Sequence, residues 1–238
     1  LTLCRGKSFG EFQWVGPDGE ELSFRFERFA LYDDIHVLAQ RVVLHSREEI
    51  SLNYISGIDG DVWSLNGEHL QKISHEEKEE ALVLRSSTSE KDLPLVVCHG
   101  VSIHQEQEGD NSAVYPVEIE APRVTSGDRS IFREGRVKVP AGGELVFHVY
   151  MSVFSGNDTN TPEEKALQSI RAVLEKGWES IEQREEELWG ALWSQYGLLI
   201  ESDDHSQIFY NFNAYHNIIA TPAHTDHLPV GARGLSCQ

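Results

Sequence analysis

Residues 144–176 read ELVFHVYMSVFSGNDTNTPEEKALQSIRAVLEK, and the hydrophobic period changes within them. The first part is a dense run of β-branched and aromatic residues, which predicts a strand over 144–154. Thr161 and Pro162 predict a helix start, because threonine can cap free backbone amides and proline at the first helical position loses no hydrogen bond. From Ala166 onward, apolar residues recur at helical spacing. Strands are therefore expected to end by about residue 156, with helices after them.

Upstream of this change, the chain is a succession of short strand-like runs. Residues 11–15 and 22–29 flank Gly16-Pro17-Asp18-Gly19, whose residue types supply turn dihedrals, so a hairpin is predicted. No helical pattern lies between the runs, which indicates a β-sandwich rather than a parallel sheet. The other strands are expected at 35–45, 48–55, 80–86, 94–104 and 129–139.

Downstream, Gly177 and Gly197 divide the chain into helices. The apolar spacing predicts helices over about 162–176 and 178–196, each ended by one of these glycines. The second helix is expected to expose its acidic residues and to pack a tryptophan-rich stripe against neighbouring elements. The stripe consists of Trp178, Ile181, Leu188, Trp189, Leu192, Trp193 and Tyr196, and the acids are Glu182, Glu185, Glu186 and Glu187.

A third helix is expected after the acidic residues Asp203 and Asp204, which suit a helix N-terminus. Thr221-Pro222 ends this helix, because proline cannot continue it. Residues 223–238 are expected to form a loop. The side of the helix predicted to be buried carries Ile208, Phe209, Phe212, Tyr215 and Ile219.

The composition describes an acidic, globular chain. Its 238 residues include 20 basic and 39 acidic side chains, a formal charge of −19 without a basic cluster, which excludes nucleic acid and anionic membranes as partners. No run approaches the roughly 18 apolar residues of a membrane helix. Cys4, Cys98 and Cys237 are too few for a secreted disulfide scaffold, and no leader precedes them, so we expect a cytoplasmic protein. Without an initiating methionine and with an abrupt end, the chain is expected to be incomplete.

Two clusters invite a metal or acid-base interpretation. His224 and His227 could bind zinc, but no third or fourth ligand stands at suitable spacing. Asp59, Asp61 and Glu68 could form an acid pair or a calcium loop, but the terminal glutamate of a calcium hand is not in place, and Asp-Gly pairs are first of all turn formers. We expect no metal site, and loop packing and a turn are the favoured interpretations.

Several motifs follow one another in order along the chain. EFQW stands at 11–14, RFAL at 28–31, GIDGDVW at 57–63 and LNGEHL at 65–70. In this order they resemble the N-terminal part of glycoside hydrolase family 65, and in particular its maltose, trehalose and kojibiose phosphorylases. The likeness spans the chain and also includes LTLCRG at 1–6, Leu188-Trp189, Leu192-Trp193, Ile200, Asp203, Asp204, Gln207, Phe212-Asn213 and Gly231 to Ser236.

The resemblance implies a mainly β fold and an inverting reaction. A mutarotase-like β super-sandwich is expected at 1–158, a two-helix linker at 159–198, and the first helix of an incomplete (α/α)6 barrel at 199–238. In the family's reaction, phosphate attacks an α-glucoside while a glutamic acid protonates the leaving oxygen, which releases β-glucose 1-phosphate and a sugar. Inorganic phosphate is the co-substrate, and no cofactor is implied. The implied partners are the disaccharide, the missing barrel and a second copy in a homodimer.

The catalytic residues of the family are not expected in this chain. After Gly-Leu-(Ser/Thr) the family continues Gly-Glu-Gly-Tyr and soon reaches Phe-Trp-Asp, whereas here Cys237 and Gln238 follow and the chain ends. The general acid and the phosphate-binding residues lie further on. The resemblance places Arg233, Gly234 and Ser236 near the mouth of the active site. The chain alone is expected to be inactive.

Three alternatives remain open from the sequence. One is a hydrolase of the same family, which would use water in place of phosphate. Another is a stand-alone carbohydrate-binding or scaffolding sandwich, with Trp14 or Trp63 stacking on sugars. A third is a mutarotase-type enzyme, although fold alone is poor support for function and the sequence does not identify a paired histidine and carboxylate.

Overall fold

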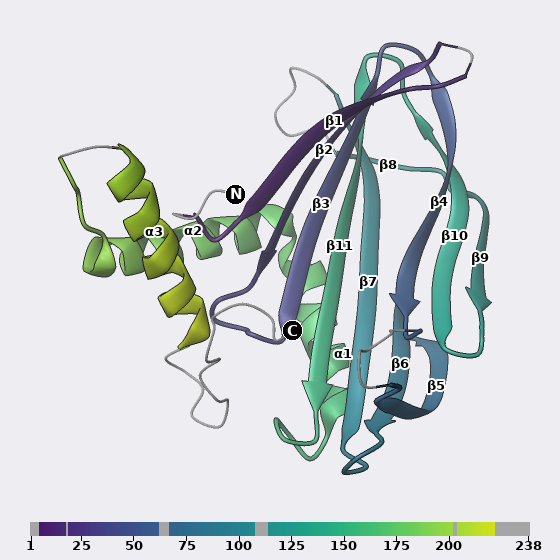
Figure 1. The fold of residues 1–238 in the computed structure, drawn as a ribbon. Helices are drawn as coiled ribbons and strands as arrows, with labels where there is room; N and C mark the ends of the chain where they lie inside the picture. The colour runs from purple at the N-terminus through teal and green to yellow at the C-terminus, as the bar shows by residue number, and fades with distance from the viewer. Residues whose placement is uncertain (1–4, 18, 62–66, 108–113, 202–203, 222–238) are drawn as a thin grey trace.

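Strands precede helices along the whole chain, whose computed structural model describes residues 5–17, 19–61, 67–107, 114–201 and 204–221 (Figure 1). The helices are α1 (Pro162–Lys176), α2 (Trp178–Tyr196) and α3 (Asp204–Ala220). The expected end of the strands and the bounds of the first two helices are therefore confirmed. The strands are β1 (Ser8–Val15), β2 (Glu21–Ala30), β3 (Val37–Ser46), β4 (Ile50–Asp59), β5 (Leu70–Lys78), β6 (Ala81–Thr88), β7 (Pro94–Gln107), β8 (Val114–Pro116), β9 (Glu120–Ser126), β10 (Ser130–Val139) and β11 (Gly143–Ser155).

The strands form two antiparallel sheets. The larger sheet has the order β1-β2-β3-β11-β7-β6-β5, with β8 paired to β7, and the smaller has the order β4-β10-β9. β4 and β10 of the smaller sheet contact β6 and β7 of the larger one. The fold is thus a β-sandwich followed by helices, as predicted. The core between the sheets includes Leu22, Leu44, Tyr54, Val137, Val139, Leu145 and Phe147.

Helix α1 covers the opposite face of the larger sheet, over β7 and β11 (Figure 1). We call this the helix face. Gly100 lies beneath α1, where a Cβ would come within 2.9 Å of Ile170 Cγ2, so glycine allows the close approach. The apolar side of α1 packs into a core that includes Ala166, Leu167, Ile170, Val173, Val37, Ala39, Cys98 and Tyr150.

The start of α1 is fixed by ion pairs rather than by a threonine cap. Pro162 stands in the first turn as predicted, but the Thr161 side chain makes no capping hydrogen bond, so that expectation is wrong. Instead Glu163 accepts hydrogen bonds from Arg85 (2.6 and 2.7 Å) and from Lys78 Nζ (2.7 Å). The Arg85 guanidinium, with Lys78, lowers the pKa of Glu163 to about 2. These contacts tie the helix N-terminus to β5 and β6.

The tryptophan stripe of α2 packs as predicted. Trp178 is fully buried against Phe29, with ring centroids 5.1 Å apart. Trp189 lies against Tyr32 at 5.9 Å and against Tyr215 of α3 at 5.4 Å. The C-terminal end of the stripe is covered less, since Leu188, Leu192 and Trp193 are half-buried and Tyr196 is exposed.

Helix α3 exposes the side that the sequence predicts to be buried. Phe209 is 67% exposed, and Ile208, Phe212 and Ile219 are exposed as well. The apolar period shows which side of a helix is suited to burial, but it does not show which other element packs against that side. No described element covers Ile208, Phe209, Phe212 and Ile219 of α3. The expectation is therefore wrong for these four residues, whereas Tyr215 is half-buried against Trp189.

Three strands, β5, β8 and β9, carry no clear signal in the sequence. β5 and β9 are edge strands, and nearly all residues of β9 are exposed. β5 contains an irregularity between Gln71 and Ser74. A strand that buries neither face needs no alternation of apolar and polar residues. A prediction based on that alternation therefore misses such a strand.

Candidate functional site

The residues predicted near the active-site mouth, Arg233, Gly234 and Ser236, lie outside the described residues. The same holds for His224, His227 and Trp63. Among the described parts of the chain, no three His, Cys, Asp or Glu side chains gather where they could hold a metal ion.

The carboxylates near residue 60 form a turn beside an arginine. The Asp61 amide donates to Asp59 Oδ1 at 3.0 Å, which is the local bond of an Asx turn. Arg129 lies 3.9 Å from Asp61 and 3.5 Å from Glu68, both measured between nitrogen and carboxylate oxygen. These contacts favour the turn interpretation.

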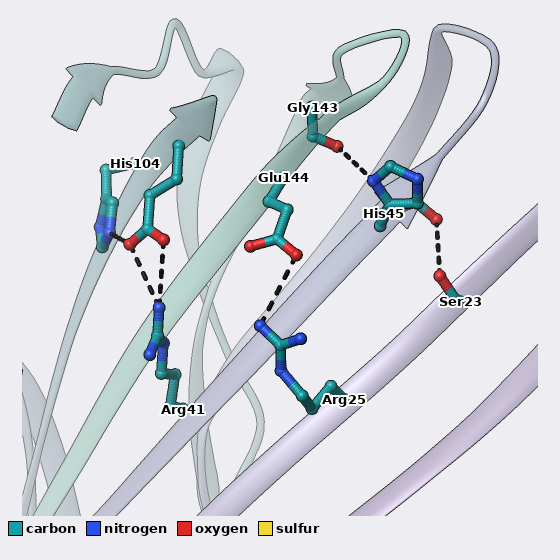
Figure 2. Close-up of polar contacts among 8 residues, drawn as sticks. Ser23, Arg25, Arg41, His45, His104, Gly143 and Glu144 are labelled. Atoms are coloured by element: carbon teal, nitrogen blue, oxygen red, sulfur yellow. Dashed lines mark hydrogen bonds and ion pairs between the residues drawn. The ribbon is translucent and has the colours of Figure 1, made fainter. Parts of the chain in front are cut away.

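Polar side chains from four strands lie together on the helix face, at the end of the sheet away from α1 (Figure 2). The register places Gln13, Ser23, His45 and Glu144 in one cross-strand row, from β1 to β11. Two residues along each strand, the next row contains Glu11, Arg25, Val43 and Val146. Both rows point to the same face because side chains alternate along a strand.

The two rows enclose a hollow of about 430 Å³, which we call the groove. Its base is apolar, since Val43 is buried. Its sides combine charged, imidazole, hydroxyl and amide groups. The residues that line it are Glu11, Phe12, Gln13, Ser23, Phe24, Arg25, Val43, His45 and Glu144.

Few hydrogen bonds connect these polar groups to one another (Figure 2). Arg25 Nη2 lies 3.6 Å from Glu144 Oε1, an ion pair that is too long for a hydrogen bond. His45 Nδ1 donates to the Gly143 carbonyl at 3.1 Å, which leaves Nε2 as an acceptor when the ring is neutral. Ser23 Oγ donates to the His45 carbonyl at 3.2 Å.

Beside the groove, a histidine and a carboxylate that sequence reasoning missed form a pair. His104 Nε2 lies 3.0 Å from Glu106, and Arg41 Nη2 donates to both oxygens of the same carboxylate at 3.1 and 3.2 Å. Spacing i, i+2 within a strand places His104 and Glu106 on one face, and this signal could have found them. Both carboxylate oxygens of Glu106 are bound by Arg41, and neither His104 nor Glu106 lines the groove. The pair therefore has a structural role, which is to fix the positions of these side chains on the sheet.

His148 lies under this network and is not poised to transfer protons. Its ring stacks on Trp178, with centroids 5.2 Å apart. Burial, together with the smaller effects of the neighbouring His104 and Arg41, lowers the pKa of His148 to about 3. The buried Nε2 has no hydrogen-bond partner in the described structure. His148 is therefore a neutral core residue at physiological pH.

Glu185 is buried rather than exposed, which corrects the expectation for the acids of α2. It is 1% exposed, and its two oxygens accept the Tyr32 amide at 3.0 and 3.1 Å. Burial raises the pKa of Glu185 to about 7, against the opposing effect of the Tyr32 hydrogen bond. Nearby, the buried Lys7 binds Glu182, which is half-buried, and Glu186. Glu186 and Glu187 are exposed, as predicted.

The pKa of Glu185 predicts a pH dependence of stability. Between pH 4.5 and 7 the folded protein keeps a proton that the unfolded chain releases, so stability falls as pH rises through this window. Glu185→Gln should remove this slope, stabilising the protein relative to wild type by about 2–3 kcal/mol more at pH 8 than at pH 4.5. Urea unfolding at both pH values measures the difference. Glu187→Gln, at an exposed position of the same helix, is the control and should show no such gain.

The groove offers donors and acceptors suited to holding a ligand. It contains two carboxylates, a guanidinium, an imidazole, an amide and a hydroxyl above an apolar base. Ligand sites combine an apolar lining with a small number of such groups. Among the described helices, none is both long and apolar enough to cross a membrane.

Comparisons with known proteins agree on one family. A family model described as "Glycosyl hydrolase family 65, N-terminal domain" matches residues 1–192. The 1,2-alpha-glucosylglycerol phosphorylase of Bacillus selenitireducens is 31% identical over 243 aligned residues, which cover 100% of this chain and 29% of that protein. The nigerose phosphorylase of Lachnoclostridium phytofermentans is 26% identical, covering 94% of this chain and 31% of that protein. The chain thus spans under a third of the length of these relatives.

A solved structure supports the fold. A protein from the human microbiome, assigned as a kojibiose phosphorylase, superposes with a TM-score of 0.78 over 92% of this chain and 27% of that one. The sequence identity of 12% limits this likeness to the architecture.

Proposed function

The chain belongs to glycosyl hydrolase family 65, and on this premise we propose that it forms the N-terminal, non-catalytic part of an inverting disaccharide phosphorylase. The parent enzyme converts a disaccharide and phosphate into β-glucose 1-phosphate and a free sugar. Phosphate enters as co-substrate, and the reaction needs no cofactor. The observation that carries the proposal is the 31% identity to a phosphorylase across the full length of this chain.

The proposed organisation assigns residues 1–158 to the sandwich, 159–198 to a helical linker and 199–238 to the start of an (α/α)6 barrel. The exposed apolar side of α3 supports this division. A helix that shows Ile208, Phe209 and Phe212 to solvent normally has a partner. We assign that role to later barrel helices of the parent, where Arg233, Gly234 and Ser236 approach the active-site mouth.

The parent is further proposed to be a cytoplasmic homodimer. The acidic composition and the few cysteines support the cytoplasmic location. Size-exclusion chromatography with light scattering on the full-length parent tests the dimer.

Sequencing the gene beyond the codon for Gln238 tests the fragment proposal. We expect an open reading frame that continues with Gly-Glu-Gly-Tyr or a close variant, then Phe-Trp-Asp and segments of helical period. Such a frame would extend the protein to the length of its phosphorylase relatives. A stop codon at this point in the natural gene, with no barrel encoded nearby, would instead favour a stand-alone sandwich.

A further inference from the structure

The groove on the helix face has hydrogen-bonding capacity that the protein itself leaves unused. The Glu11 carboxylate and the Gln13 amide are exposed and make no hydrogen bond with any described residue. Arg25 makes only the 3.6 Å ion pair to Glu144, so its N–H groups are available to a ligand. His45 Nε2 adds an acceptor.

The charge of the groove selects the class of ligand. Glu11 and Glu144 against Arg25 give a net charge of −1 with His45 neutral, which disfavours phosphate and other anions. A hydroxyl group both donates and accepts hydrogen bonds, so it can satisfy carboxylates and a guanidinium alike. A neutral compound with several hydroxyl groups fits this set.

The apolar part of the lining is the base of the groove, where the carbon-bound hydrogens of a sugar can pack. The Phe12 and Phe24 side chains stack on each other at 4.5 Å on the opposite face of the sheet, so they do not form part of this lining. Val43 closes the base.

The dimensions of the groove suit more than one ring. Its volume of about 430 Å³ lies within the range of small-molecule sites. The row from Gln13 to Glu144 crosses four strands, or about 14 Å at about 4.8 Å per strand.

From these observations we infer that the groove binds a neutral di- or oligosaccharide, at a site separate from the barrel. The hydrogen-bonding argument is independent of the proposed function, which guides only the choice of α-glucosides as probes. Because the site is contained in residues 11–144, it can be tested on the chain of 238 residues.

In the first test, this chain is titrated with maltose and with kojibiose, and binding is measured by calorimetry and by changes in amide NMR shifts. We expect saturable binding with Kd on the order of 1 mM, with shifts confined to the strand segments around the groove. Inorganic phosphate at the same concentration should not displace the sugar. Absence of saturable binding by either sugar, shifts centred elsewhere, or displacement by phosphate would each overturn the assignment.

Variants locate the site. Arg25→Gln should weaken maltose binding about tenfold and Glu11→Gln at least threefold, because each removes a charged hydrogen-bonding partner. Arg123→Gln is the matched control, since Arg123 is also an exposed strand arginine, paired with Glu134 at 2.8 Å but on the smaller sheet. The Arg123→Gln variant should bind maltose with the same affinity as the wild-type chain.

Glu11→Gln keeps the test decisive if Arg25→Gln does not fold, because Glu11 is exposed and bonds to no described residue. Unchanged binding by Glu11→Gln, or an equal loss in Arg123→Gln, contradicts the inference. Neither result bears on the phosphorylase proposal, because no step of this experiment requires the barrel.

Discussion

The chain of 238 residues should release neither glucose nor glucose 1-phosphate from maltose, kojibiose or nigerose, with or without phosphate. Inverting cleavage needs an acid on the leaving oxygen, a nucleophile on the opposite side and contacts that fix the ring. General acid catalysis contributes about 10²–10⁴-fold and positioning a comparable or larger factor. Glu185 has the pKa of a general acid, but it is buried between α2 and Tyr32 and cannot reach a substrate. We expect turnover at least about 10⁴-fold below the roughly 1 per second of an ordinary enzyme.

An assay for released sugar and sugar phosphate checks this, with the nigerose phosphorylase of Lachnoclostridium phytofermentans on nigerose as the positive control. Turnover near 1 per second by the chain alone would show that the active site lies within it. Activity that returns when the parent's remaining segment is added as a separate chain, and only with phosphate present, would support both the fragment and the phosphorylase.

Replacing Trp178 with alanine should cost more stability than any other change considered. Its indole is 0% exposed and joins three elements, because it packs on Phe29 of β2, stacks on His148 of β11 and donates from Nε1 to Glu182 at 3.1 Å. Deleting a buried tryptophan side chain typically costs about 3–5 kcal/mol. In a domain of this size that corresponds to a loss of about 6–20 °C in melting temperature. Circular dichroism during thermal unfolding measures it.

Trp14→Ala provides the matched comparison. Trp14 is 44% exposed on β1. Its replacement by alanine should therefore lower the melting temperature by no more than a few degrees. Equal effects of the two substitutions would mean that the α1–α2 junction does not depend on the Trp178 packing described above.

The helices and most strands could be predicted because each has a local signal. Pro162 begins α1, Gly177 separates α1 from α2, and Gly16 to Gly19 turn the first hairpin. These residues act within a few positions of themselves, so no knowledge of distant contacts is needed. Edge strands such as β9 have no such signal.

The groove could not be predicted, because it depends on register. Gln13, Ser23, His45 and Glu144 come from four strands that the chain visits over more than a hundred residues. A slip of one residue in any pairing would turn its side chain to the other face. The burial of Glu185 has the same origin, since the amide that it binds, at Tyr32, lies 153 residues earlier.

The contact between Lys7 and Glu182 also imposes an order of events during synthesis. The two residues are 175 positions apart. At about 5–20 residues per second, Lys7 is incorporated about 9–35 s before its partner. The nascent chain therefore holds Lys7 without this partner at first, and the ion pair closes only when α2 has emerged. Translation speed through the segment encoding α1 and α2 thus determines how long the N-terminal edge stays open to chaperones or to a neighbouring nascent chain.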